Sequence, residues 1–360
     1  MTEKKYYYGL DILRAAMMLY GVFFHVGSWL KWKDFGHLAN KIHHSDNIWA
    51  IVSFTQPFRM ETFFVVAGFL SCMVIRRKGK SPFFKARIKR VLYPLIFGVM
   101  LVNLIHISYF YFLGILNYDR FYLFYFVLHG WFLASLFSFA LLDIGLNTNK
   151  IYQNEYLMLP ILLVLSIFHK ELWQFFEFIP FHNIKITADF YDLFVIMPSH
   201  YLIYYYMGSR LFVRQDLIAK VKRKNVIIML IIGLIFALLT HLQNNNYVDF
   251  FALLNIKKSA YLGLSISSVA GIAMSLSLFI IFYNYNKPNG KIITYLINSS
   301  IAIYIVHHPL VAIFSWYLDF APIRNIHFYI IVCSLTLIFS FGIYEIIRRN
   351  NFTKVLFGLK

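Results

Sequence analysis

Long apolar segments recur from one end of this chain to the other, and they constrain its fold more than any other feature. Of the 360 residues, 60% are hydrophobic and 14% are charged, whereas a soluble domain carries about 25% charged residues. A helix needs about 20 mostly apolar residues to cross a bilayer. We therefore expect an all-α polytopic integral membrane protein, folded as one membrane-embedded domain over residues 1–360 without a separate soluble domain.

The lengths of these segments predict about ten transmembrane helices. The first segment carries Arg14 and lacks a small-residue cleavage site, which indicates a retained helix and not a signal peptide. The segment at 156–169 is short for a bilayer, so we expect it to be tilted, partial or re-entrant. The predicted helices cover residues 11–30, 48–75, 88–113, 121–142, 156–169, 191–213, 225–242, 260–283, 294–317 and 326–348.

The positions of the basic residues predict the orientation of these helices. Most of the 34 Lys and Arg, including the cluster from Arg76 to Arg90, fall in alternate loops that share one side of the membrane. The positive-inside rule therefore places both termini in the cytoplasm. The net charge of +18 follows mostly from this asymmetry. A nucleic-acid partner would need a soluble basic face, which the sequence does not offer.

The sequence does not predict a metal centre. Cys72 and Cys333 lie alone within apolar segments, where we expect them to be small buried hydrophobic side chains. His43 and His44 beside Asp46 lack the helical spacing of a ligand pair, so they are a weak signal for a metal. We therefore expect no metal cofactor.

An arginine and a histidine share one face of the first predicted helix. An arginine within a membrane helix is costly, roughly 2.5–3.5 kcal/mol on insertion scales, and such residues usually face protein or a water-filled pathway. Eleven positions of about 100° bring His25 back to the direction of Arg14, roughly 16 Å further along the axis. Asp11 lies three residues before Arg14, where it partly neutralises the guanidinium. The helix thus carries an acid–base pair near one surface and an imidazole deep inside.

Three further helices are expected to bring polar side chains to about the depth of His25. Alternatives exist for several of them: His129 as a structural hydrogen-bonding residue, an Arg59–Glu61 ion pair, and one of the two adjacent histidines as a packing residue. Pro309 follows these histidines and frees a carbonyl, which lipid tolerates only against protein or a wet cavity. The convergence predicts a site. Its residues are Arg59 and Glu61 on the second helix, His129 and Trp131 on the fourth, and His307 and His308 on the ninth.

A pair of arginines begins the third predicted helix at its cytoplasmic end. Arg87 and Arg90 are three residues apart, so one helix face presents both guanidinium groups to a polyanion. Alternatively, the basic cluster from Arg76 to Arg90 only orients the protein and contacts anionic lipid. A phosphate site at the surface with a histidine deeper inside suits a donor that is polyanionic at one end and reactive at the other, such as acyl-coenzyme A.

The motifs of this chain resemble those of the acyltransferase-3 family of ten-helix membrane acyltransferases, and the subgroup it resembles most is that of enzymes that succinylate periplasmic glucans. Two positions depart from that subgroup: Glu61 replaces a frequent proline, and Gly130 a larger apolar residue. The segments that carry the resemblance are Leu10-Asp11-Ile12-Leu13-Arg14 with His25, Phe58-Arg59-Met60 with Phe63 to Phe69, Arg87-Ile88-Lys89-Arg90 with Pro94, His129-Gly130-Trp131-Phe132, Tyr304-Ile305-Val306-His307-His308-Pro309-Leu310, Tyr344-Glu345 and Phe357-Gly358-Leu359-Lys360.

The resemblance implies transfer of an acetyl or succinyl group from cytoplasmic acyl-CoA to a hydroxyl of an extracytoplasmic or lipid-linked glycan, in the inner membrane of a bacterium. Arg14, Arg87 and Arg90 would hold the phosphates of the coenzyme. His25 would act as general base or acyl carrier, with His307 as the second candidate, and Arg59 would stabilise the thioester oxyanion. In a supporting set we place Asp11, Glu61, His129, Trp131, His308 and Glu345.

Two other classes of protein remain open from the sequence. A proton-coupled secondary transporter of a small or carbohydrate substrate would also contain intramembrane His and Arg and a proline-broken helix, but no internal repeat is visible. A scaffold without chemistry leaves the cost of Arg14, Arg59 and Glu61 unexplained. The expected partners are the glycan acceptor and membrane lipids, and the sequence leaves open whether the chain forms a homo-oligomer.

Overall fold

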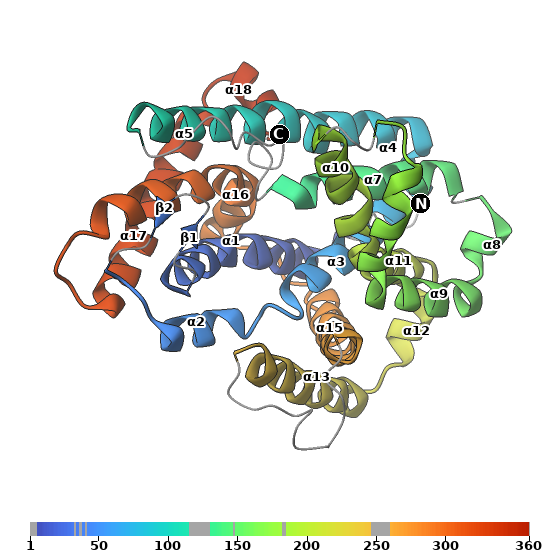
Figure 1. Cartoon of the computed structure of the whole chain (residues 1–360). Coiled ribbons are helices and arrows are strands. Elements are labelled where there is room, and N and C mark those ends of the chain that lie inside the picture. The colour runs from blue at the N-terminus through green and yellow to red at the C-terminus, as the bar shows by residue number, and fades with distance from the viewer. Residues whose placement is uncertain are drawn as a thin grey trace.

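The computed structural model describes residues 6–31, 34–35, 38–39, 42–114, 130–146, 148–181, 185–245 and 260–359, and within them the chain is a bundle of helices (Figure 1). The strands in these ranges are β1 (Asp34–Phe35) and β2 (Leu38–Ala39), which pair antiparallel. The helices are α1 (Tyr8–Lys31), α2 (Asp46–Ser53), α3 (Arg59–Lys78), α4 (Lys80–Arg87), η1 (Ile88–Leu92), η2 (Pro94–Val99), α5 (Met100–Phe112), α7 (Trp131–Leu146), α8 (Lys150–Gln153), α9 (Glu155–Ile167), η5 (His169–Phe178), α10 (Lys185–Tyr191), η6 (Asp192–Ile196), α11 (Met197–Val213), α12 (Gln215–Lys220), α13 (Arg223–Asn244), α15 (Ala260–Tyr283), α16 (Lys291–Leu318), α17 (Asn325–Ile347) and α18 (Asn351–Leu356).

The helices confirm the class of polytopic membrane proteins. In the described ranges, 6 helices are long and apolar enough to cross a membrane, or 7 if the pair α9 and η5, bent by 80°, forms one span. The bend agrees with the expectation that the segment at 156–169 is not a straight crossing. The predicted count of ten helices is not reached by these criteria, and the orientation of the termini stays a prediction.

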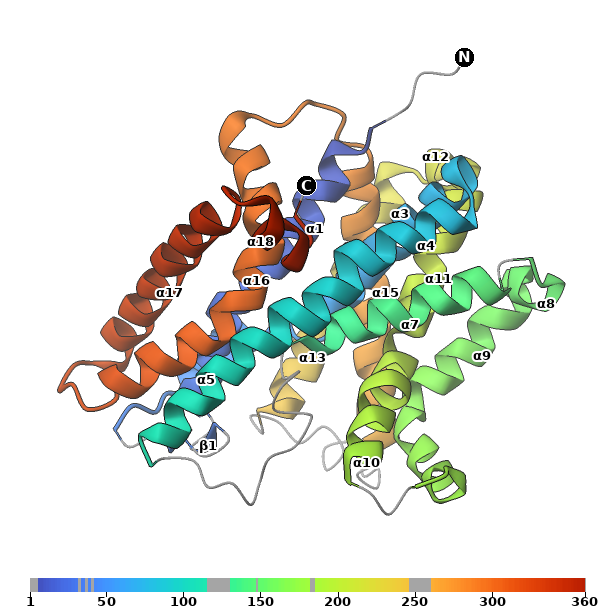
Figure 2. The same ribbon diagram turned by 90° about the horizontal axis from the view of Figure 1, so that it is seen from above.

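Two predicted helices have different ends in the structure. The segment 48–75 is broken at 54–58, because Pro57 cannot donate a helical hydrogen bond and disfavours helix in the residue before it. Arg59 and Glu61 therefore lie in the first turn of α3 and not in the middle of a long helix. The third predicted helix begins at Lys80 and continues through the π-helical segments η1 and η2 to Phe112 as one 33-residue rod (Figure 2).

Glycines set the closest helix contact in the bundle. A Cβ on Gly68 of α3 would lie 1.9 Å from the carbonyl oxygen of Tyr205, and one on Gly208 of α11 would lie 1.9 Å from that of Val65. Only glycine allows this approach, and small residues serve the same purpose in other membrane helix pairs. The packing holds α11 directly against α3, while α1 lies among α3, α15 and α16 (Figure 2).

Candidate active site

Three histidines from two helices meet between α1 and α16. The ring centroid of His25 on α1 is 5.3 Å from that of His307 and 4.9 Å from that of His308. Both histidines of α16 are buried. Both adjacent histidines therefore lie beside His25. The side chains of neighbouring helix positions point about 100° apart. The His25 ring on α1 lies between these two directions and therefore contacts both rings of α16.

The backbone of α16 fixes the ring of His307. Its Nδ1 lies 2.6 Å from the carbonyl oxygen of Tyr304, so this nitrogen carries the proton and donates it. The other ring nitrogen, Nε2, faces α1 where that helix has a glycine: a Cβ on Gly21 would lie 3.4 Å from it. In the neutral ring Nε2 is a proton acceptor. The cluster thus directs a basic nitrogen to the α1–α16 contact, one turn of α1 before His25.

Arg59 lies beside this cluster, and its donors are poorly satisfied. The centre of the guanidinium is 4.2 Å from the ring centroid of Phe24 and 6.0 Å from that of Tyr20. Its Nε and Nη1 are buried and have no hydrogen-bond partner among the described residues. An unsatisfied buried donor costs about 1–3 kcal/mol and more when charged. These N–H groups therefore suit the oxygen atoms of a ligand.

Glu61 does not form the ion pair with Arg59 that was one reading of the sequence. Positions two apart on a helix point in different directions, and the carboxylate faces α11 instead. Its Oε1 lies 3.7 Å from Nε2 of His200, and its Oε2 has no partner among the described residues. His200 is not among the site residues that the sequence predicts. Only the close packing of α3 on α11 identifies it as a neighbour of the site.

Aromatic side chains line the same region from α7. The ring of Trp131 stacks on Tyr201 of α11 at 5.0 Å with an interplanar angle of 29°. The next residue, Phe132, contacts Tyr304 of α16 at 4.2 Å. Trp131 is therefore at the site as expected. His129, predicted from the same motif, lies outside the described residues.

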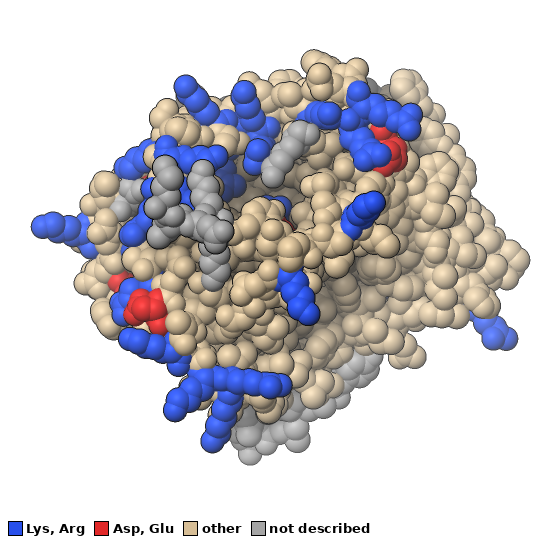
Figure 3. Space-filling view, turned by 180° about the vertical axis from the view of Figure 1, so that it is seen from behind, with Lys and Arg blue, Asp and Glu red and all other residues tan. Residues whose placement is uncertain are grey.

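The other predicted arginines lie at the opposite end of α1. Arg14 forms an ion pair with Asp11 at 3.3 Å, with 36% of its side chain exposed. Arg87 donates to Oγ of Ser71 and is half-buried, whereas Arg90 is exposed. Arg14 and Arg90 both interact electrostatically with Arg87. Figure 3 shows Lys and Arg side chains spread around a hollow on one face of the molecule.

The supporting residue Glu345 is not part of the histidine cluster. It accepts hydrogen bonds from Tyr295 and Arg348, each at 2.7 Å. Tyr295 precedes His307 by twelve positions on α16, or roughly 18 Å along the axis. Near the end of the chain, Gly358 at φ 67° packs on the Lys80–Phe112 rod that carries Arg87 and Arg90. A Cβ on this glycine would lie 2.7 Å from Pro94. The motifs around Glu345 and Gly358 therefore lie away from the histidine cluster.

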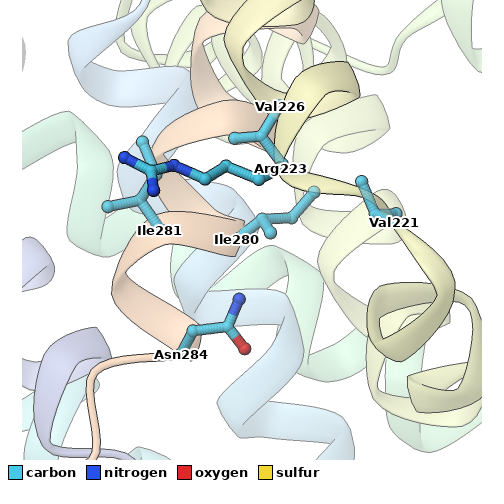
Figure 4. Close-up of a pocket in the computed structure, with 6 residues that line it drawn as sticks. All are labelled: Val221, Arg223, Val226, Ile280, Ile281 and Asn284. Carbon is cyan, nitrogen blue, oxygen red and sulfur yellow. The ribbon is translucent and has the colours of Figure 1, made fainter.

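A separate pocket lies between the start of α13 and the end of α15 (Figure 4). Its volume is about 290 Å³, and its walls are apolar apart from Arg223 and Asn284. These helices do not carry the histidine cluster, so we do not assign the pocket to the site. Within the described ranges no group of three or more His, Cys, Asp and Glu side chains is arranged to hold a metal ion.

Comparison with known proteins finds one family that matches nearly the whole chain. The profile of a family described as "Acyltransferase domain" matches residues 7–345. Glucans biosynthesis protein C from Salmonella typhi and from Salmonella enteritidis PT4 is 25% identical to this chain, over 98% of this chain and 94% of theirs. No solved structure matches. The family match and the apolar helices place the chain in the inner membrane of a bacterium as a multi-pass protein.

Proposed function

The chain belongs to the acyltransferase-3 family of membrane acyltransferases, and from this premise we propose its donor, its acceptor and the roles of its residues. The donor is cytoplasmic acyl-CoA carrying an acetyl or succinyl group. The acceptor is a hydroxyl of an extracytoplasmic or lipid-linked glycan. The relatives named for glucan biosynthesis support a glycan as acceptor.

The observation that carries this proposal is the contact of His25 with His307 and His308 beside the unsatisfied donors of Arg59. Acyl transfer to a hydroxyl needs a base for the hydroxyl proton and donors for the negative charge that develops on the thioester oxygen. The cluster supplies both within one region of the bundle. A channel or scaffold has no need for unpaired guanidinium donors next to a fixed basic nitrogen.

The donor would bind from the end of α1 that carries Arg14. Arg14 and Arg90 each repel the charge of Arg87, and the phosphates of coenzyme A would offset that repulsion. From Arg14, the pantetheine arm would follow α1 for roughly 16 Å to His25. Arg90 is the more accessible member of its pair, because Arg87 already bonds Ser71.

The transfer step follows from these positions. His25 removes the proton of the acceptor hydroxyl as its oxygen attacks the thioester carbonyl carbon, and Arg59 donates to the carbonyl oxygen as it becomes negative. The carbon–sulfur bond then breaks, an ester forms, and the coenzyme thiolate takes up the proton. In the alternative route the acyl group rests on His25 before it reaches the acceptor. Both routes leave the enzyme unchanged, with free coenzyme A as the second product.

The experiment that tests the proposal uses the purified full chain in detergent with isotope-labelled acetyl-CoA or succinyl-CoA and a glucan acceptor. We expect acceptor-dependent release of coenzyme A and an acyl ester on the glucan, detected by mass spectrometry. Release of coenzyme A without an ester on the glucan would exclude the acceptor class. Glycan exchange across liposomes without any use of acyl-CoA would contradict the proposal and favour transport.

A further inference from the structure

A second cluster of polar side chains lies next to the histidine site, and the proposed reaction gives none of its residues a role. It joins Glu61 of α3, His200 of α11, Ser166 of α9 and His169 of η5. Glu61 is 4% exposed and Ser166 is fully buried. His169, at the bend between α9 and η5, is half-buried. The cluster therefore forms a polar track that leads from the edge of the bundle towards Glu61.

Helix α9 fixes the orientation of His200. Its Nδ1 lies 3.1 Å from the carbonyl oxygen of Ser166 and 3.0 Å from Oγ of the same residue. His169 bonds the same carbonyl through its own Nδ1 at 2.9 Å. With Nδ1 committed to α9, the His200 ring turns Nε2 towards Glu61. The His200 ring therefore lies at ion-pair distance from the carboxylate and limits where Oε1 of Glu61 can lie.

Glu61 has hydrogen-bonding capacity that the protein leaves unused. Its Oε1 is 3.7 Å from Nε2 of His200, longer than a hydrogen bond, and its buried Oε2 has no partner among the described residues. On the same turn of α3, Arg59 keeps Nε and Nη1 unpartnered. One acceptor and two donors are thus directed to different sides of one helix turn. A sugar carries several hydroxyl groups that each donate and accept, so one can donate to Oε2 of Glu61 while another accepts from Arg59.

The surroundings of Glu61 suit a sugar more than a simple alcohol. Tyr201 contacts the His200 ring at 4.7 Å and stacks on Trp131, which is half-buried. Aromatic side chains give a sugar ring an apolar surface, and a few placed polar groups fix its hydroxyls. A carboxylate, a guanidinium and an indole within one region meet that description.

We propose that Glu61, oriented by His200, is the acceptor-binding residue of this enzyme and accepts a hydrogen bond from a hydroxyl of a sugar that lies against Trp131. The hydroxyl next to the bound one is thereby presented to His25 and Arg59. This inference rests on the proposed function for its role in catalysis, but the binding of the sugar is separable from it. His200 acts as a positioning residue.

The test measures binding and kinetics of Glu61→Gln, His200→Gln and the control Glu171→Gln in the full chain. Glu171 is the control carboxylate: it accepts side-chain hydrogen bonds from Gln174 and Tyr261 and lies on η5, outside the cluster of Glu61 and His200. Calorimetry with a short glucose oligosaccharide gives the affinity. Steady-state kinetics give separate KM values for the oligosaccharide and for acyl-CoA.

For Glu61→Gln we expect the affinity for the oligosaccharide to fall at least tenfold, with the KM for acyl-CoA unchanged. His200→Gln should give a smaller loss of the same kind, and Glu171→Gln none. Equal affinities in Glu61→Gln and Glu171→Gln would overturn the proposal, as would an unaltered protein that does not bind the oligosaccharide. If Glu61→Gln does not fold, Glu61→Asp decides in its place, since retained full affinity there would contradict the role. Should the unaltered chain bind the sugar but never use acyl-CoA, the proposed donor fails while this inference stands.

Discussion

The two ends of α1 present the same kinds of side chain in opposite environments. At the deep end, His307 is fully buried and the Nε and Nη1 of Arg59 lack partners among the described residues. At the other end, Arg14 is 36% exposed and paired with Asp11, and Arg90 is exposed. A charge in a low-dielectric region acts strongly on a neighbouring atom, whereas an exposed charge is screened by water and salt.

The comparison separates two kinds of effect on the reaction. Side chains of the deep cluster should determine the rate of the chemical step, because they meet the reacting atoms where water is excluded. Side chains of the basic end should determine donor affinity through their summed charge, and single residues there should matter less. The predictions below test this division.

The largest effect is expected for His25→Gln. Glutamine keeps a hydrogen-bonding group but cannot take up a proton near neutral pH, so the general base is lost. We expect kcat to fall by about 10²–10⁴-fold, with donor binding retained, in assays of acyl ester formation. The control is His327→Gln, an exposed histidine on α17. Activity retained in a folded His25→Gln protein would move the base to His307 and break the comparison.

Arg59→Lys should be the next most severe change. Lysine keeps the charge but loses the planar fork that presents several N–H groups at once. Loss of a donor to a developing oxyanion costs about 10²–10³-fold in kcat. The measurement is kcat at saturating donor, with Arg324→Lys, an exposed position before α17, as the control. A change in the donor KM alone would assign Arg59 to binding and not to the chemical step.

The double change Arg87→Ala and Arg90→Ala should act mainly on the donor. We expect the KM for acyl-CoA to rise roughly tenfold, because exposed charge-assisted contacts contribute about 1 kcal/mol or less each. The dependence of KM on salt should weaken at the same time, since fewer screened charges remain. Lys222→Ala with Lys224→Ala is a matched pair of exposed basic residues. An unchanged KM and an unchanged salt dependence would mean that the two arginines do not bind the donor and only orient the protein in the membrane.

Gly21→Ala should have the smallest effect. The new methyl group would lie in van der Waals contact with Nε2 of His307, at 3.4 Å, and would fill the space beside that nitrogen. We expect a several-fold loss of kcat without loss of donor affinity. Gly263→Ala on α15 is the control, because a Cβ there meets no atom within 4 Å. A loss as large as that of His25→Gln would mean that the position of His307 is as critical as the base itself.

Much of the site followed from spacing in the sequence. The eleven-residue interval placed His25 on the Arg14 face, and the estimated depths along the predicted helices brought Arg59, Trp131, His307 and His308 into one predicted site. Charge and hydropathy cannot predict the hydrogen bond from Arg87 to Ser71, because a single serine in an apolar helix has no periodicity that identifies its partner. The family resemblance placed Glu345 in the supporting set, although it lies with Tyr295 and Arg348 away from the histidine cluster.

The sequence by itself determined the class of this protein, because apolar segments of bilayer length leave a chain few alternatives to crossing a membrane as helices. It also determined the family, through motifs spread along the whole chain. Only the tertiary structure decided which partner each buried polar group has. Glu61 turned to His200 and not to Arg59, because Gly68 and Gly208 let α3 and α11 approach closely. Such contacts depend on helix packing between segments more than a hundred residues apart, and periodicity within one helix does not contain that information.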